Sequence, residues 1–509
     1  LKEIVFEDGI EAIPEYIASK AEKLEQVVIP ESVKVIGDNA FYQTKNLKQI
    51  TLPEELESIG DYAFAESGLT NIVIPGSITR VGYGAFSGSQ LISVEFCKGD
   101  EYTEAILNDY VFMNCENLNT LKLSENIVYI GGYLIYGTKI SSITITKNVR
   151  SNSVGMLQGG EYLKELIFEE GTEEIPEWIA AEADKLERVV IPKGVKVIGD
   201  NAFYQTKSLK QISLPEGLKT IGNNAFCESG LSNIVIPGSI TLIKSNAFEN
   251  SQLISVEFLD SDEYIETELE DNIFKNCKNL TTLELSKNIA FIGHEIIGGT
   301  KITSVVVPKN FKASGHAAYT YEGGFGGSEY LKEIIFEEGI EVIPEYTVSH
   351  AEKLEKAVIP ASVTRIENDV FHGCLRLVIY GIPGSYAETY AELNQIPFKS
   401  ISENYPGIYK NPDYVIKIVN SGSKKPIIGA VITIDGKQVG VSDDNGKIKI
   451  NCYGTASQRI KITKSGYKAV YYTGMPWSSS TENIVEMSIA DNVESVVKNM
   501  FTDVKLGES

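Results

Sequence analysis

A pattern that recurs every 22 or 23 residues constrains the fold of this chain more than any other feature. Residues 47–64, LKQITLPEELESIGDYAF, show it completely. Leu47, Ile50 and Leu52 have the spacing of a short strand with one apolar face, and the proline after them ends that strand. Phe64 then fills a turn with a large apolar side chain. A unit this small cannot bury its own apolar surface, so each copy must stack on the next.

The sequence holds 17 copies of this repeat, and a longer duplication lies over them. The segment VKVIGDNAFYQTK occurs unchanged at 33–45 and 195–207, and a truncated third copy of the long unit starts at Leu331. Seven repeats therefore make one block, and the array is two blocks plus three repeats. The first apolar strand residue of each repeat, which we call its marker, is Leu1, Leu24, Leu47, Leu69, Leu91, Leu118, Ile140, Leu163, Leu186, Leu209, Leu231, Leu253, Leu280, Ile302, Leu331, Leu354 and Leu377.

The form L-x-x-I-x-I-P-x-x-V-x-x-I-G-x-x-A-F resembles the BspA-like leucine-rich repeats of bacterial surface and secreted proteins, over roughly residues 1–400. The resemblance implies a curved solenoid and an adhesive role, without naming a ligand. We predict an α/β repeat solenoid, with a parallel sheet on one face and short helices or turns on the other. Seventeen stacked strands would make one continuous parallel sheet about 80 Å long.

The segment EYIASKAEKL and its two counterparts suggest a short amphipathic helix in the first repeat of each block. We expect the aromatic residues of these helices, Tyr16, Trp178 and Tyr346, to point into the core.

The last part of the chain changes character after the repeats. A helical cap is expected near 384–398, where Tyr386, Tyr390 and Leu393 share one helical face, and a linker at 401–412. Residues 413–490 alternate apolar and polar side chains between turn signals, which predicts a small all-β sandwich. The order KPIIGAVITIDGKQVGVSDDNGKIKI resembles a carboxypeptidase-regulatory-like domain, which implies an accessory module without catalytic residues.

Residues 491–509 form a polar tail that is too short for a domain. Its end, FTDVK, resembles the opening F-x-D-V of S-layer-homology modules, which hold exported proteins to the cell wall. Leu1 is already a strand residue of a repeat, so we expect the chain to be trimmed at its N-terminus. The tail is then the expected start of a missing wall-anchoring module, and a fraying end is the alternative.

Composition narrows the classes of partner. The formal charge is 46 − 69 = −23, which argues against nucleic acid and against unaided binding to anionic lipid. No apolar run approaches the length of a membrane span, so no membrane insertion is expected. Six scattered cysteines do not form a disulfide scaffold or a C-x-x-C metal motif, and we expect buried thiols.

The sequence contains no convergent set of catalytic groups. None of the four histidines recurs at the same position in both blocks, so none belongs to a repeated site. The turn at 443–446, DDNG, has carboxylates that could bind calcium, although it lacks the spacing of an EF-hand loop; a plain hairpin turn is the alternative. We therefore expect no enzyme activity, no cofactor and no metal site.

The expected function is non-enzymatic: an extracellular bacterial protein, secreted or attached to the cell surface, that presents an extended surface to a protein or glycan. A passive spacer on the cell wall and a cryptic hydrolase are the alternatives. The outward positions of the sheet lack an aromatic platform for stacked sugars, and their small polar and β-branched residues suit either protein contact or any exposed strand. Candidate contacts are a loop found only in the second block, with Tyr319, Tyr321 and Phe325, and four outward strand residues, Val73, Glu95, Val235 and Glu257. The bulges at 100–112 and 262–274 lie one block apart, so a site at a bulge should occur twice.

Overall fold

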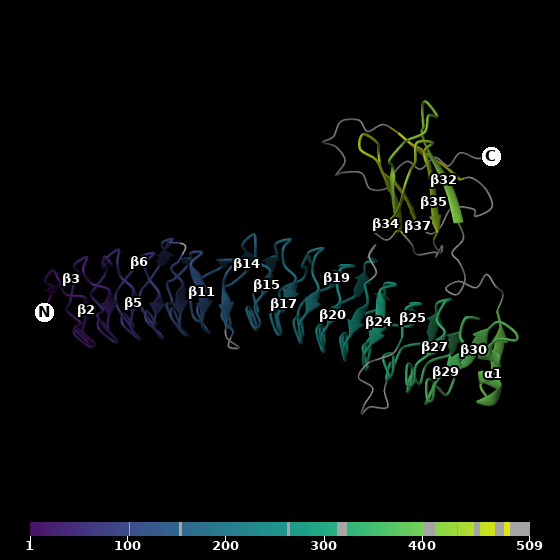
Figure 1. Cartoon of the computed structure of the whole chain (residues 1–509), viewed down its shortest axis with the longest axis horizontal. Helices are drawn as coiled ribbons and strands as arrows, with labels where there is room; N and C mark the ends of the chain where they lie inside the picture. The colour runs from purple at the N-terminus through teal and green to yellow at the C-terminus, as the bar shows by residue number, and fades with distance from the viewer. Residues whose placement is uncertain are drawn as a thin grey trace.

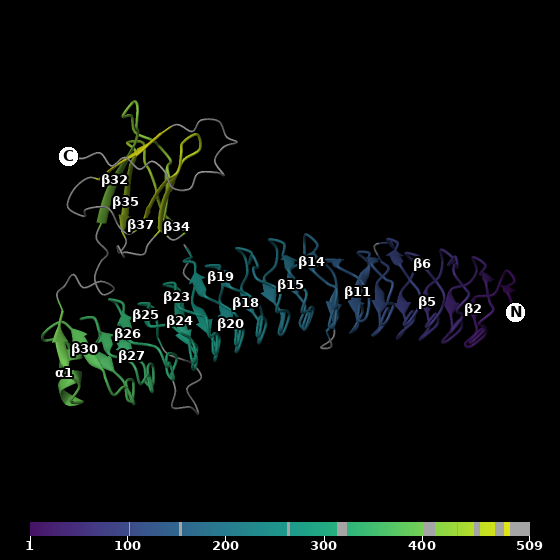
Figure 2. The same cartoon turned by 180° about the vertical axis from the view of Figure 1, so that it is seen from behind.

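The repeats stack side by side along one long axis in the computed structural model (Figure 1), and the view from behind shows the same order (Figure 2). The structure describes residues 1–100, 102–151, 155–261, 265–312, 323–401, 413–434, 436–451, 459–473 and 483–488. Most repeats have three sides, namely two short strands and a turn, and each side lies beside its counterparts in the neighbouring repeats.

The first side is the strand that follows the marker, and these parallel strands form what we call sheet 1. Its side chains alternate, so that Ile72 and Ile74 are buried while Asn71 and Val73 are exposed. The strands are β1 (Glu3–Val5), β3 (Gln26–Val28), β6 (Asn71–Ile74), β8 (Ser93–Phe96), β10 (Thr120–Lys122), β12 (Ser142–Ile145), β14 (Glu165–Phe168), β16 (Arg188–Val190), β19 (Asn233–Ile236), β21 (Ser255–Phe258), β23 (Thr282–Glu284), β25 (Ser304–Val307), β26 (Glu333–Phe336), β28 (Lys356–Val358), β30 (Val378–Gly381) and β31 (Phe398–Ser400).

Sheet 1 is not continuous, so the prediction of one unbroken sheet is wrong. Its bonded groups are β1-β3, β6-β8-β10, β12-β14-β16, β19-β21-β23 and β25-β26-β28-β30-β31. The repeats that start at Leu47 and Leu209 form no strand after their markers. The phenylalanine rings that stack beneath the turns are 5.2–5.6 Å apart, whereas paired strands prefer about 4.8 Å. The breaks in sheet 1 do not follow the ring spacing, because β6 and β8 are paired although the rings of their repeats, Phe86 and Phe112, are 5.6 Å apart.

The second side is a shorter strand just before the turn, and these strands form sheet 2. It runs unbroken through the first block as β2-β4-β5-β7-β9-β11-β13, then as β15-β17-β18-β20-β22-β24 and β27-β29. The interruption between β13 and β15 therefore falls where the first block meets the second. The strands are β2 (Ala12–Ile13), β4 (Val35–Ile36), β5 (Ser58–Ile59), β7 (Arg80–Val81), β9 (Ala105–Leu107), β11 (Ile127–Ile130), β13 (Arg150–Ser151), β15 (Glu174–Ile175), β17 (Val197–Ile198), β18 (Thr220–Ile221), β20 (Leu242–Ile243), β22 (Thr267–Leu269), β24 (Ile289–Ile292), β27 (Val342–Ile343) and β29 (Arg365–Ile366).

The third side is a turn whose backbone alternates between left- and right-handed conformations. In the second repeat Asn39 and Gln43 have φ angles of 52° and 59°. The N–H groups of Asn39, Phe41 and Gln43 donate to carbonyl oxygens of the next repeat at 2.8–2.9 Å. Buried rings stack under these turns at Phe41, Phe64, Phe86 and Phe112 in the first block and at Phe203, Phe226, Phe248 and Phe274 in the second. The turns are thus a third hydrogen-bonded ladder.

This ladder replaces the helices that the sequence predicted, so the α/β class is wrong for the repeats. A left-handed residue cannot continue an α-helix, and Tyr16, Trp178 and Tyr346 all have φ angles of 57–58°. Tyr16 is 61% exposed instead of pointing into the core, and Trp178 and Tyr346 are only partly buried. Within the described residues the repeat array is a β-solenoid.

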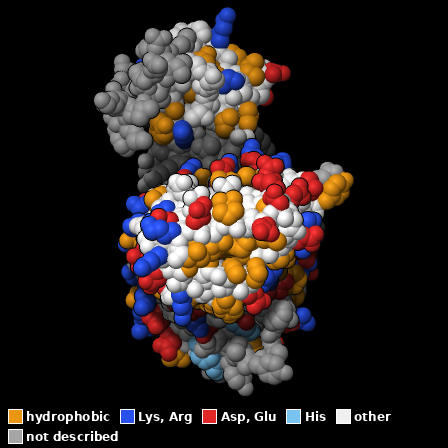
Figure 3. Space-filling model, turned by 90° about the vertical axis from the view of Figure 1, so that its left-hand side faces the viewer, with side chains coloured by type: hydrophobic (Ala, Val, Ile, Leu, Met, Phe, Trp, Pro, Cys, Tyr) orange, Lys and Arg blue, Asp and Glu red, His pale blue; other side chains and the backbone are white. Residues whose placement is uncertain are grey.

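The two ends of the array differ. At the C-terminal end the single α-helix of the described residues, α1 (Tyr386–Leu393), buries Ala387 and Ala391, whereas Leu393 on the expected inner face is 78% exposed. At the N-terminal end Leu1, Val5 and other apolar side chains are exposed, and Figure 3 shows hydrophobic side chains gathered on that end face.

The part of the chain after residue 412 has its own hydrophobic core, separate from that of the repeats. One sheet has the order β35-β32-β38 and the other the order β34-β33-β36-β37, and all pairs are antiparallel except β32 with β38. The strands are β32 (Asp413–Asn420), β33 (Val431–Ile434), β34 (Lys437–Val441), β35 (Lys447–Asn451), β36 (Arg459–Thr463), β37 (Val470–Thr473) and β38 (Asn483–Met487).

Candidate functional site

The outward residues of sheet 1 in the first block place an apolar side chain beside an ion pair. Val73 on β6 lies directly beside Glu95 on β8, and Glu95 lies beside Lys122 on β10. Val73 is 56% exposed. The Lys122 Nζ atom is 2.5 Å from a Glu95 carboxylate oxygen, and this hydrogen bond raises the pKa of Lys122. Both charged side chains are largely exposed, so the pair contributes little to stability and stays accessible to a ligand.

The second block repeats this row with one decisive change. Val235 on β19 is 48% exposed and lies beside Glu257 on β21, which in turn lies beside Glu284 on β23. Glu284 takes the place of Lys122, so the formal charge of the row changes from 0 to −2. A ligand that recognises charge therefore meets two different surfaces, although the duplicated blocks share one backbone design.

A surface hollow of about 590 Å³ lies next to the row in the first block. It sits where β10 and β12 are neighbours in the array but are not paired in sheet 1. Glu95, Lys122 and Thr144 contribute outward side chains to it, and Leu121 and Ile143 contribute apolar surface. The break in sheet 1 thus produces the hollow, and it brings the candidate residue Glu95 to its wall.

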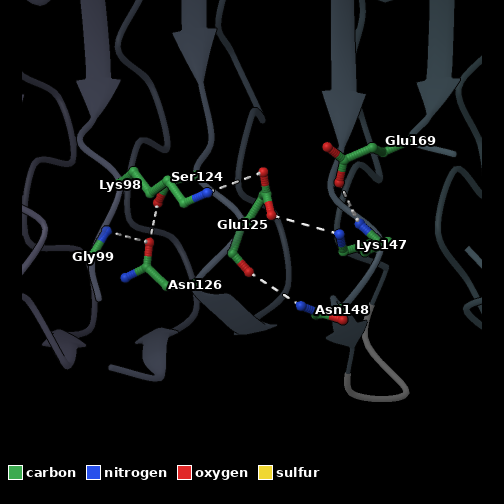
Figure 4. A network of polar contacts seen from close by, with 8 residues as sticks. All are labelled: Lys98, Gly99, Ser124, Glu125, Asn126, Lys147, Asn148 and Glu169. Atoms are coloured by element: carbon green, nitrogen blue, oxygen red, sulfur yellow. Dashed lines mark hydrogen bonds and ion pairs between the residues drawn. The ribbon is translucent and has the colours of Figure 1, made fainter. Parts of the chain in front are cut away.

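One end of the hollow is lined by alternating charges from successive repeats, shown in Figure 4. The Lys98 Nζ atom lies 3.7 Å from a Glu125 oxygen, and Glu125 lies 3.5 Å from the Nζ atom of Lys147. The backbone N–H of Lys147 donates to Glu169 at 3.1 Å. Each of these charges has an opposite charge or a donor beside it, so this rim offers polar contacts without a strong net charge.

Asparagine side chains fix the turns that carry those charges. Asn126 Oδ1 accepts from the Gly99 N–H at 3.3 Å and from the Ser124 hydroxyl at 2.6 Å. Asn148 donates to the Glu125 carbonyl oxygen at 3.3 Å, which links the next repeat to the same turn. The network joins successive repeats and holds the rim of the hollow in place.

The loop residues predicted as contacts do not form a site in the described structure. Phe325 is fully buried, which contradicts its assignment as a contact. It occupies the place in its turn that Phe64 holds in the third repeat, so packing against neighbouring repeats decides its position. Tyr319 and Tyr321 lie outside the described residues.

The two bulges can be compared only in part, because residues 101 and 262–264 are not described. Within the described residues, β9 and β22 show that part of each bulge belongs to sheet 2.

Sequence reasoning missed a second group of exposed side chains, on the turn side of the first block. Four consecutive repeats place Tyr62, Tyr83, Tyr110 and Tyr133 next to one another, with ring centroids 5.0–5.5 Å apart. The signal was available in the sequence, because each tyrosine follows closely on the residue that ends the sheet 2 strand.

The described residues hold no group of three or more His, Cys, Asp or Glu side chains that could bind a metal ion. Asp443 uses a carboxylate oxygen to accept the N–H groups of Asn445 and Lys447 at 2.9 and 2.8 Å, as in a hairpin turn. Burial raises the pKa of Cys115 to about 11 and that of Cys277 to about 12, so neither thiol is an activated nucleophile at neutral pH.

Comparison with known proteins identifies the repeat. The family model for the BspA type leucine rich repeat region matches residues 1–105, 100–209, 196–324, 267–378 and 320–393. The chain belongs to this family. Proteins with such repeats are found on bacterial cell surfaces and are generally binding or adhesive. No curated protein sequence is significantly similar to the chain.

Solved structures to which this chain is similar include a leucine-rich repeat protein from Bacteroides ovatus, at 21% identity and a TM-score of 0.36, covering 79% of this chain and 84% of that one. A leucine rich cell surface protein from Faecalibacterium prausnitzii has 19% identity and a TM-score of 0.28, covering 68% and 87%. The pneumococcal vaccine antigen PcpA has 18% identity and a TM-score of 0.32, covering 74% and 80%. In the described part of this BspA-type chain, no helix is long and apolar enough to span a membrane.

Proposed function

We propose that this BspA-type protein is a non-enzymatic binding protein of the bacterial cell exterior, and that sheet 1 contacts an extracellular protein. Membership of the repeat family supports the location and the general role. The support for sheet 1 comes from the arrangement of its exposed side chains.

One observation carries the proposal: exposed valines recur at one outward position of sheet 1 in both blocks. Each valine occupies the same position, four residues after its marker, and is between 40% and 62% exposed. The valines are Val5, Val28, Val73, Val235 and Val306. Apolar side chains that recur on one face, with charged side chains beside them, have the composition of a protein interface. A β-branched side chain also suits an exposed strand, but only a partner would remove these exposed valines from water.

The test uses the full chain on an array of purified extracellular proteins and glycans. We expect the unmodified chain to bind at least one protein, and the double variant Val73→Asp, Val235→Asp to bind it about tenfold or more weakly, because burying a carboxylate without a partner is costly. Val35→Asp is the matched control, since Val35 is 39% exposed but lies on sheet 2. An equal loss in the control variant would contradict the assignment to sheet 1.

The same array separates the alternatives. A passive spacer would bind nothing on it, and a hydrolase would change one of the arrayed molecules.

We further propose the domain limits: repeats over 1–400 with a helical cap near 384–398, a linker at 401–412, and an accessory β-sandwich of the carboxypeptidase-regulatory-like kind over 413–490. Limited proteolysis should cut first between 401 and 412. The suggested wall-anchoring segment at 491–509 lies outside the described residues.

A further inference from the structure

The tyrosines on the turn side of the first block form a continuous row, which we call the tyrosine ladder. Its ring centroids are 5.5 Å apart for Tyr62 and Tyr83, 5.0 Å for Tyr83 and Tyr110, and 5.1 Å for Tyr110 and Tyr133. Tyr136 extends the row, with its ring 6.0 Å from that of Tyr133. Tyr62, Tyr83 and Tyr136 are 37–39% exposed. The ladder therefore spans four repeats on a different side of the solenoid from sheet 1.

The second block shows that the fold does not need these tyrosines. The positions one block later hold Asn224, Ser245, Asn272, Glu295 and Gly298. The buried rings beneath stack equally well in both blocks: Phe64 and Phe86 are 5.3 Å apart, and so are Phe226 and Phe248. The same turn therefore forms with or without an aromatic residue on its surface.

The backbone makes tyrosine an unfavourable choice at three of these positions. Tyr62, Tyr110 and Tyr133 have φ angles of 53°, 62° and 57°, in the left-handed region. Asparagine adopts this region more readily than other residues with a β-carbon, and the second block has it at the counterparts of Tyr62 and Tyr110, with φ angles of 51° and 58°. The left-handed backbone costs stability, and the ring contacts between the tyrosines offset part of that cost. Tyr62, Tyr83 and Tyr136 still leave apolar surface exposed, which a ligand outside the fold would cover.

The spacing of the ladder distinguishes between extended ligands. A β-strand repeats its side chains on one face about every 6.8 Å, and a polyproline II helix repeats about every 9 Å, so neither matches rings 5.0–5.5 Å apart. A chain of equatorially linked pyranose sugars advances by nearly this distance for each sugar. Such a chain can place one sugar beside each ring.

The chemistry of the ladder also suits a sugar chain. The planes of Tyr83 and Tyr136 are turned by 57–78° from those of their neighbours, whereas Tyr110 and Tyr133 are stacked at 5°, so the ladder has a mixture of ring orientations. Aromatic carbon can pack on the C–H groups of sugars, while phenol hydroxyls exchange hydrogen bonds with sugar hydroxyls. Asp109 lies in one of these turns, Asp61 in another is paired with Arg80 at 2.9 Å, and the whole chain carries a formal charge of −23, so a neutral glycan suits this surface better than a negatively charged one.

We propose that the tyrosine ladder binds a neutral, equatorially linked polysaccharide, with about one sugar per repeat. This site is independent of the protein contact proposed for sheet 1, because it lies on another side of the array and occurs only in the first block. A result that overturns the polysaccharide site on the tyrosine ladder therefore leaves the protein contact on sheet 1 unaffected, and the reverse also holds.

Isothermal titration calorimetry of the full chain with cellohexaose and with chitohexaose tests this proposal. We expect one binding site for at least one of the two, and no binding of maltohexaose, whose axial linkages coil the chain. The triple variant Tyr62→Asn, Tyr83→Ser, Tyr110→Asn carries the residues of the second block. It should bind about tenfold or more weakly while its melting temperature stays the same or rises.

A second variant tests the proposal by introducing tyrosines at the corresponding positions of the second block. Asn224→Tyr, Ser245→Tyr and Asn272→Tyr together should build a second ladder and raise the number of sites from one to two. The proposal is overturned if the unmodified chain binds neither hexasaccharide, or if the triple variant binds as tightly as the unmodified chain. It is also overturned if sedimentation shows that the unmodified chain is a dimer and that the triple variant is not. The strands of a second copy stack at nearly the spacing of the rings, so a second copy would then be what covers the ladder.

Discussion

Replacing Phe64 with alanine should weaken the array strongly but locally. Phe64 is fully buried, and its ring lies 5.2 Å from that of Phe41 and 5.3 Å from that of Phe86, nearly parallel to both. Removing it leaves a cavity between two neighbours that are held in place by their own repeats. Because each repeat contacts only the repeats beside it, the damage should stay within about one repeat on either side.

The magnitude follows from these contacts. Truncating a buried phenylalanine to alanine costs about 3–5 kcal/mol, and each of the two ring pairs contributes about 0.5–1.5 kcal/mol of that. With a ring on both sides, Phe64→Ala should reach about 4–5 kcal/mol. Phe371 has a single aromatic neighbour, Tyr390, at 6.3 Å, so Phe371→Ala should cost about 3 kcal/mol. Phe226 repeats the surroundings of Phe64, with rings at 5.3 Å on both sides, and Phe226→Ala should match it.

Hydrogen exchange read by mass spectrometry is the suitable assay, because it reports stability repeat by repeat. The amide of Gln43 donates to the carbonyl oxygen of Ala65 across the affected repeats at 2.9 Å. A loss of about 4 kcal/mol should speed its exchange about a thousandfold, while the second block keeps its protection. An increase below about tenfold at Gln43, or equal loss of protection in both blocks, would refute the reasoning from local stacking.

Two further predictions concern titratable groups. Burial raises the pKa of Glu337 above the pKa that the same carboxyl group has in the unfolded chain. The charged form therefore lowers the stability of the fold at high pH, and this cost disappears once the pH falls below the pKa of the unfolded chain, where both states are protonated. Glu337→Gln should therefore raise the free energy of unfolding at pH 7 and change nothing at pH 3, whereas Glu338→Gln, at an exposed neighbour, should have little effect at either pH. The second prediction is that a thiol reagent at pH 8 modifies exposed Cys97 quickly and leaves buried Cys115 and Cys277 unmodified until the chain unfolds, as peptide mapping would show. Rapid modification of either buried thiol in the native chain would contradict the packing described above.

The sequence alone determined the period, the core and the family of the repeats. The residues predicted to face inward, such as Leu47 and Phe64, are fully buried, because an apolar residue that recurs once per repeat must lie on the same inner line. The sequence also located Val73 and Glu95 on the open face, since side chains alternate along a strand. These features follow from local spacing, which a linear pattern records.

Only the tertiary structure decided the conformation of the turns and the shape of the surface. The turn at Tyr16 looked helical by composition, but its backbone bonds to the next repeat, 22 residues away, where Tyr16 N–H donates to the Asp38 carbonyl oxygen at 3.0 Å. Sheet 1 is interrupted at the repeats that start at Leu47 and Leu209, which form no strand there although their markers match those of the other repeats. The tyrosine ladder likewise exists only once successive turns lie side by side. Contacts between repeats, rather than the preferences of any one repeat, set these features.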